Sequence, residues 1–196
     1  MFTDMPDSVA VRMRELEELD DRDRRDDTPQ LERLRQIPAE TGRFLAILCA
    51  GAPEGQVLEV GTSAGYSGLW LSLACRVTGR RLRTYEVLEA KLALARETFS
   101  VAGVEDVVDL VAGDFLTRAD DLGEVGFCFL DAEKDVYAAA YEMVVPHLVP
   151  GGLLVADNVI SHQSSLQGFV DAAEADSRVD AVVVPIGKGE LVCRRV

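Results

Sequence analysis

The chain has 196 residues, 48% of them hydrophobic, and its 34 acidic and 20 basic residues give a formal net charge of −14. A chain of this length buries one sizeable core, and its negative charge repels nucleic acid and anionic membrane surfaces. We therefore expect one domain that acts on a small molecule, with neither nucleic acid nor a membrane as a partner.

Residues 1–35 form a charged N-terminal segment. A weak apolar repeat of Val9, Met13 and Leu16 runs into the mixed charges of "RELEELDDRDRRDDTPQ", and Pro29 ends the pattern. This predicts a solvated helix followed by a turn. The segment lacks the basic start and apolar stretch of a secretory signal, and no apolar run approaches 18 residues.

Four cysteines lie far apart in the chain, at Cys49, Cys75, Cys128 and Cys193, and no two of them form a CxxC pair. Three sit inside apolar runs, where cysteine behaves as a small hydrophobic residue. We expect reduced thiols and hence a cytoplasmic location.

Residues 36–196 read as a single α/β domain. Pro38 marks the start of a helix that Gly51 ends, and after Gly55 short apolar runs alternate with segments of helical period. Five such runs predict strands buried on both faces of a parallel sheet, and two more close the chain as an antiparallel hairpin. We expect a Rossmann-like, mostly parallel seven-stranded sheet with helices on both faces. The predicted strands are 57–60, 82–85, 107–111, 127–130, 153–156, 181–184 and 191–193.

In such a sheet, ligands bind beyond the carboxyl ends of the strands. The first strand runs into "EVGTSAGYSGLW", whose glycines allow a ligand to approach the backbone before a helix that begins near Ser67. The glycine spacing is G-x-x-x-G-x-x-G, whereas a dinucleotide fingerprint needs G-x-G-x-x-G. Glu86 follows the second strand as an acceptor for ribose hydroxyls, and Glu59 suits the amino group of a cationic ligand. S-adenosylmethionine is such a ligand.

From Gln36 to the C-terminus the chain resembles the cation-dependent O-methyltransferases, the family of catechol and caffeoyl-CoA O-methyltransferases. The motifs that carry this resemblance are "IPAETGRFL", "LEVGTSAGYS", "YEV", "FLDAEKDVY" and "ADNVI", which occur in the family's order. The resemblance implies an S-adenosylmethionine-dependent O-methyltransferase of the bacterial type, commonly a homodimer.

The resemblance also implies roles for individual residues. Asp131, Asp157 and Asn158 would hold a divalent cation, and Lys134 would be the catalytic base. The residues that would bind or line S-adenosylmethionine are Ile37, Glu59, Gly61, Thr62, Ser67, Glu86, Asp114, Phe115, Asp131 and Ala132.

The chemistry of these side chains agrees with those roles. Two carboxylates and an amide oxygen suit a hard ion, Mg²⁺ in the first place, with Mn²⁺ or Ca²⁺ as alternatives. A cation-bound hydroxyl of a catechol-like acceptor or vicinal diol loses its proton more readily, and a neutral Lys134 can accept that proton before the oxygen attacks the sulfonium methyl.

Plainer interpretations exist for each residue. Asp131 and Asp157 can cap strand ends, Asn158 can form a turn, and Lys134 can be a solvated lysine at a helix start. A nucleotide-dependent oxidoreductase of NAD(P) type would use the glycine loop and Glu86 but leave the acidic cluster unexplained. A non-catalytic S-adenosylmethionine-binding protein is a third alternative.

Overall fold

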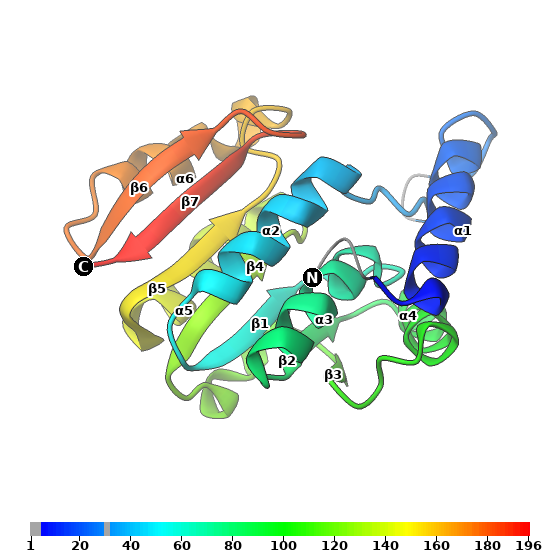
Figure 1. The fold of residues 1–196 in the computed structure, drawn as a ribbon. Coiled ribbons are helices and arrows are strands. Elements are labelled where there is room, and N and C mark those ends of the chain that lie inside the picture. Colours follow the sequence, from blue (N-terminus) through cyan, green and yellow to red (C-terminus); the bar gives the residue numbers. More distant parts are fainter. Residues whose placement is uncertain (1–4, 30–31) are drawn as a thin grey trace.

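A single sheet of seven strands forms the centre of the computed structural model, which describes residues 5–29 and 32–196 (Figure 1). The strands follow one another in space in the order β3-β2-β1-β4-β5-β7-β6. Their bounds are β1 Gln56–Val60, β2 Leu82–Glu86, β3 Val108–Ala112, β4 Val125–Leu130, β5 Leu148–Ala156, β6 Val179–Val184 and β7 Glu190–Arg195.

The first five strands are parallel, whereas β7 runs antiparallel to both of its neighbours, β5 and β6. The predicted parallel sheet and closing hairpin are therefore confirmed. The sequence did not predict that β7 lies between β5 and β6, which brings its first residue beside the end of β5. In register, Val60 pairs with Leu130 and Leu130 with Ala156, so three strand ends lie level at one edge.

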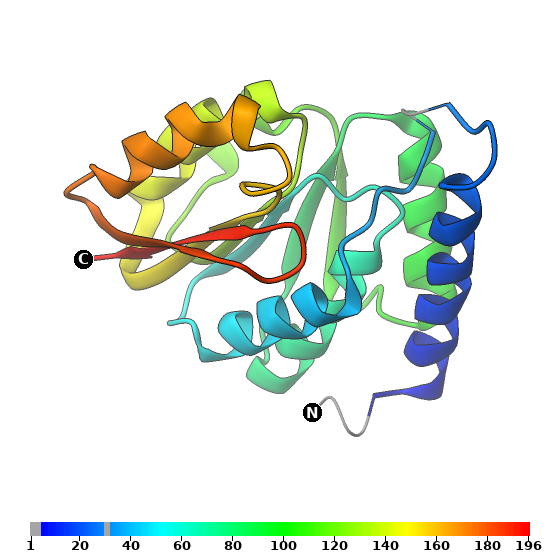
Figure 2. The same cartoon turned by 90° about the horizontal axis from the view of Figure 1, so that it is seen from above.

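Helices cover both faces of the sheet (Figure 2). Successive side chains of β4 point to opposite faces, and both faces are apolar. Phe127 and Phe129 belong to one hydrophobic core, and Cys128 and Leu130 belong to the other. The first core includes residues of α2 (Ala39–Gly51), α3 (Tyr66–Thr78) and α4 (Glu89–Ala102). The second includes residues of α5 (Tyr137–Val144) and α6 (Gln163–Glu174).

The charged N-terminal segment contains the predicted helix, α1 (Asp7–Asp23), and it packs along α4 (Figure 2). Its apolar repeat of Val9, Met13 and Leu16 is buried in the first core. Arg12 also reaches α4, where its Nε donates a hydrogen bond to Thr98 Oγ1 over 3.2 Å. The helix is thus solvated on its outer face only. A domain boundary near residue 36 stays a prediction.

The sequence also predicted reduced thiols and no membrane-spanning segment. All four cysteines are buried free thiols. Within residues 5–29 and 32–196, no helix has both the length and the apolar character needed to cross a membrane.

Candidate functional site

The predicted site residues lie along the edge of the sheet where the parallel strands end. The backbone pairing continues one residue past the strands, since Asp131 N–H donates to Val60 O and Asp157 N–H to Leu130 O, each over 3.0 Å. These two bonds fix the backbones of Asp131 and Asp157 side by side. Adjacent parallel strands therefore bring together carboxylates that are 26 residues apart in the sequence.

The glycine loop, residues 61–65, connects β1 to α3. Gly61 has φ of +101°, and a Cβ at this position would collide with the carbonyl oxygen of Asp131. The N–H groups of Gly61 and Thr62 both donate to Tyr85 O, over 3.0 and 3.2 Å. The loop is therefore held close to the ends of both β2 and β4, with no room for a side chain at its first position.

Glu59 is a fully buried carboxylate at the end of β1. Its Oε2 accepts a hydrogen bond of 2.5 Å from Thr84 Oγ1, which also contacts Thr62 Oγ1 over 2.5 Å. Among the described residues its Oε1 is buried without a hydrogen bond of normal geometry, although the Ser67 hydroxyl lies near enough to the carboxyl to lower its pKa. Burial raises the pKa of Glu59 from 4.5 to about 7. A buried acceptor of this kind is suited to a cationic donor such as an ammonium group.

Glu86 ends β2 and is held by three backbone donors. Its Oε2 accepts from Ser63 N–H over 2.8 Å, and its Oε1 accepts from the N–H groups of Val87 and Leu88, each over 2.9 Å. A carboxylate has about four acceptor positions, so roughly one remains for a ligand hydroxyl. The side chain is fixed before any ligand arrives.

The other predicted cofactor residues lie along the same edge. Asp114 is exposed after β3, and its Oδ1 accepts from Leu116 N–H over 2.9 Å. Phe115 is buried against Tyr85 with ring centroids 5.1 Å apart. Ile37 is buried before α2, Ser67 is buried in the first turn of α3, and Ala132 follows Asp131. Their roles in ligand binding stay predictions.

Asp131, Asp157 and Asn158 meet at the ends of β4 and β5. Asn158 Nδ2 donates to Asp131 Oδ1 over 3.0 Å, and Asn158 has φ of 72°, which turns the chain sharply after β5. Asp157 is fully buried; its Oδ1 accepts from Asn158 N–H over 2.5 Å, while its Oδ2 is buried without a partner among the described residues.

The cluster offers oxygen atoms to a cation. The described residues include no preformed group of three His, Cys, Asp or Glu side chains arranged to hold an ion. The two carboxylates and the Asn158 amide nevertheless form an oxygen donor set of the kind that Mg²⁺ prefers. The unpartnered Oδ2 of Asp157 is an acceptor that lacks a positive group. The donor set fits a divalent cation by its chemistry.

Glu190, the first residue of β7, is a site residue that the sequence analysis missed. It is fully buried beside Asp157. Burial raises the pKa of both carboxyls, and the charge of Asp131 raises that of Asp157 further. The sequence contained one indication of this role, because "GKGELVC" has an acidic residue at the start of an apolar strand.

Lys134 begins a short 3₁₀ turn, Lys134–Val136, which follows β4 after residues 131–133. Its Nζ donates to Ala132 O over 2.9 Å and to Tyr137 Oη over 2.8 Å, and it lies 3.4 Å from Asp131 Oδ1. Tyr137 Oη in turn donates to Asp157 O over 3.1 Å. Burial raises the pKa of Tyr137, which keeps its hydroxyl protonated. Tyr137 therefore links Lys134 to the backbone of β5, in addition to packing in the core.

A segment that we call the strap, residues 32–37, lies beside this edge before α2. Two lysines hold it at opposite ends. Lys91 Nζ donates to Glu32 O over 2.6 Å and to Arg33 O over 2.8 Å. Lys188 Nζ, from the turn between β6 and β7, donates to Arg35 O over 3.1 Å and to Gln36 O over 3.2 Å.

The strap also contacts the glycine loop and the segment after β4. Ser63 Oγ donates to Leu34 O over 3.0 Å, and Arg35 forms a 2.8 Å ion pair with Glu133. It therefore connects the cofactor side of the site to the side that carries Lys134.

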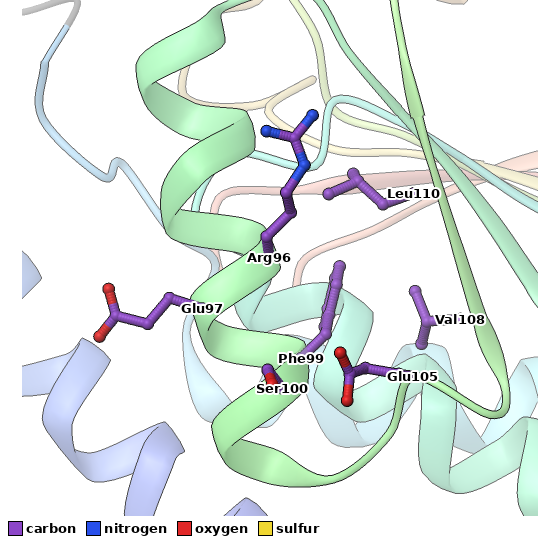
Figure 3. A pocket seen from close by; sticks show the side chains of 7 residues that line it. All are labelled: Arg96, Glu97, Phe99, Ser100, Glu105, Val108 and Leu110. Atoms are coloured by element: carbon purple, nitrogen blue, oxygen red, sulfur yellow. The ribbon is translucent and has the colours of Figure 1, made fainter.

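A cavity of about 450 Å³ lies elsewhere, between α4 and β3 (Figure 3). The ring of Phe99 lies between this cavity and the glycine loop, because a Cβ at Gly65 or Gly68 would come within 2.9 Å of it. The cavity brings together none of the predicted site residues. Its lining residues are Arg96, Glu97, Phe99, Ser100, Glu105, Val108 and Leu110.

Comparisons with known proteins agree with this arrangement. The sequence profile of a family described as O-methyltransferase matches residues 8–196. The chain is 32% identical over 154 residues to catechol O-methyltransferase of Mycobacterium tuberculosis, covering 78% of this chain and 69% of the relative. It is 30% identical over 188 residues to caffeoyl-CoA O-methyltransferase 2 of Zea mays, covering 83% and 71%.

The fold has solved counterparts as well. The O-methyltransferase from Bacillus cereus in complex with SAH superposes with a TM-score of 0.78 at 22% identity, covering 95% of this chain and 91% of that chain. The expected methyltransferase fold is thus confirmed. The family match also favours a methyltransferase over a nucleotide-dependent oxidoreductase. The chain belongs to the O-methyltransferase family.

Proposed function

We propose that this protein transfers the methyl group of S-adenosylmethionine to a hydroxyl of a small catechol-like or vicinal-diol acceptor, with the help of a divalent cation. The observation that carries the proposal is the meeting of Asp131, Asp157, Asn158 and Lys134 at two adjacent strand ends, next to the glycine loop. Asn158 Nδ2 and Lys134 Nζ lie 3.0 and 3.4 Å from the same Asp131 oxygen.

The cofactor side of the site is anionic. Glu59 offers a buried, unpartnered oxygen to the amino group, and Glu86 offers its remaining acceptor position to a ribose hydroxyl. S-adenosylmethionine, when bound, supplies an electrophilic sulfonium methyl. The tight contact of Gly61 with Asp131 places the loop against the cation side, so both ligands bind within reach of each other.

The cation side prepares the acceptor. A divalent cation held by Asp131, Asp157 and Asn158 would lower the pKa of an acceptor hydroxyl. We assign the acceptance of that proton to Lys134, whose Nζ lies 3.4 Å from Asp131 Oδ1. Tyr137 keeps Lys134 in place by its 2.8 Å hydrogen bond.

The test is a methyl-transfer assay with catechols, flavonoids, hydroxycinnamates and hydroxamates, followed by mass spectrometry of the products. Chelation should abolish transfer, and added Mg²⁺ or Mn²⁺ should restore it. Full activity in a chelator-treated sample contradicts the role of the cation. Binding of S-adenosylmethionine without transfer to any acceptor favours the non-catalytic alternative.

The homodimer and the cytoplasmic location are further proposals. The reduced thiols and the family resemblance support them. Light scattering tests the first, since a monomer mass of about 21 kDa at micromolar concentration contradicts a dimer.

A further inference from the structure

Glu190 has an unusual environment for a carboxylate. It begins β7, where Leu191 pairs with Ala156, and it therefore lies beside Asp157 just past the end of β5. Its side chain is fully buried, and no donor from another residue's side chain reaches Oε1, Oε2 or the Oδ2 of Asp157 within the described residues. The two carboxyls lie against each other instead, and burial together with the charge of Asp157 raises the pKa of Glu190 to about 10. In the cation-free protein the pair therefore shares a proton.

The donors of the neighbourhood are engaged elsewhere. Lys188 Nζ donates to the strap carbonyls of Arg35 and Gln36, and Lys134 Nζ donates to Ala132 O and Tyr137 Oη. Asn158 Nδ2 donates to Asp131. A buried pair of carboxyls without a donor from another side chain must hold a positive charge, either a proton or a cation. The cluster can therefore exchange its proton for a positive group that comes from outside the chain.

We infer that Glu190 is a third carboxylate of the cation site, which positions Asp157 and strengthens the binding of a divalent cation through it. This inference rests on the cation site of the proposed function. Glu190 is a positioning residue, because it contacts Asp157 rather than completing a preformed group of ligands. Residues that orient a ligand of a metal ion commonly change its affinity by about 10- to 100-fold.

A purely structural role for Glu190 predicts a different behaviour. In that case its replacement lowers the stability of the cation-free protein and leaves the affinity for the cation unchanged. A residue kept for the cation should show the reverse. Replacement by glutamine, which keeps a donor for Asp157, should leave the stability of the cation-free protein unchanged and lower the affinity for the cation.

The experiment measures Mn²⁺ binding by the loss of the free-ion electron paramagnetic resonance signal, together with thermal unfolding of the cation-free protein. The variants are Glu190→Gln and Glu190→Leu, and the second keeps the test open if the amide variant does not fold. Glu174→Gln is the matched control, because it removes one negative charge from an exposed position on α6. Titration with S-adenosylmethionine reports on the rest of the site.

We expect both Glu190 variants to bind Mn²⁺ about 10- to 100-fold more weakly than the wild type, with unchanged affinity for S-adenosylmethionine, and Glu190→Gln to keep the thermal stability of the wild type. Glu174→Gln should bind Mn²⁺ as the wild type does. Wild-type Mn²⁺ affinity in a folded Glu190 variant overturns the inference and leaves the cation site standing. A wild-type protein that binds no Mn²⁺ at millimolar concentration overturns the cation site itself and the inference with it.

Discussion

Glu59→Gln replaces a fully buried carboxylate with a neutral side chain of the same shape, and its effect on stability should depend on pH. Burial raises the pKa of Glu59 from an ordinary 4.5 to about 7 in the folded protein. Between pH 4.5 and about pH 7, Glu59 therefore keeps its proton in the folded state and has lost it in the unfolded state. The stability that this proton gives is fully present below pH 4.5 and is lost as the pH rises through about 7.

The size of the effect follows from the shift. Each unit of pKa difference corresponds to about 1.4 kcal/mol, so the ionised Glu59 costs the ligand-free protein about 3 kcal/mol above neutral pH. Glutamine keeps an oxygen that can accept from Thr84 and never carries the charge. At pH 5 the two proteins should have similar free energies of unfolding, and at pH 8 the variant should be more stable by about 3 kcal/mol.

Urea or thermal unfolding of both ligand-free proteins from pH 5 to pH 9 measures this difference. A gain of about 3 kcal/mol corresponds to a rise in Tm of about 6 to 12 °C for a domain of this size. Subtracting one curve from the other removes the pH dependence that all other groups contribute. The same variant should bind S-adenosylmethionine more weakly, since the ligand's amino group loses its counter-charge. A stability difference that stays constant from pH 5 to pH 9 refutes the reasoning.

Four more predictions concern the site. Lys134→Met should retain cofactor and cation binding but lower kcat by roughly 10² to 10⁴, with partial recovery at high pH; wild-type kcat from pH 6 to 9 would show that Lys134 is not the base. Asp157→Ala should abolish Mn²⁺ binding in calorimetry and leave S-adenosylmethionine affinity nearly unchanged, whereas loss of both indicates misfolding. Gly61→Ala should lower Tm and cofactor affinity together, because its Cβ collides with Asp131 O, and an unchanged Tm argues against that contact. Tyr137→Phe should lower kcat more than it raises KM, because Lys134 loses a 2.8 Å hydrogen bond; an unchanged kcat would mean that Tyr137 only packs.

Much of the fold followed from local patterns, because each parallel strand is a short apolar run between polar segments. The run at 127–130 is such a case: β4 is buried on both faces and lies in the middle of the sheet. The glycine loop, Asp131 and Asp157 followed from the rule that the residues after parallel strands share one edge.

Glu190 did not follow, since it lies at the beginning of a strand, not at its end. Only the antiparallel direction of β7 and its place between β5 and β6 bring it to the site. The connection between Tyr137 and Asp157 O was missed for a related reason. The hydrogen bond joins the Tyr137 hydroxyl to a backbone carbonyl 20 residues later in the chain. Every residue has a carbonyl, so the pattern of side-chain types does not predict such a bond.

The strap accepts hydrogen bonds through its backbone along most of its length. Five consecutive carbonyls, at positions 32–36, accept hydrogen bonds from Lys91, Ser63 and Lys188. Three donors outside the strap therefore fix its path, while the side chains of Leu34 and Ile37 are buried in the core and Arg35 pairs with Glu133. Substitutions at the exposed positions 32 and 35 leave these backbone hydrogen bonds in place, which makes those two positions suited to altering acceptor preference by mutagenesis.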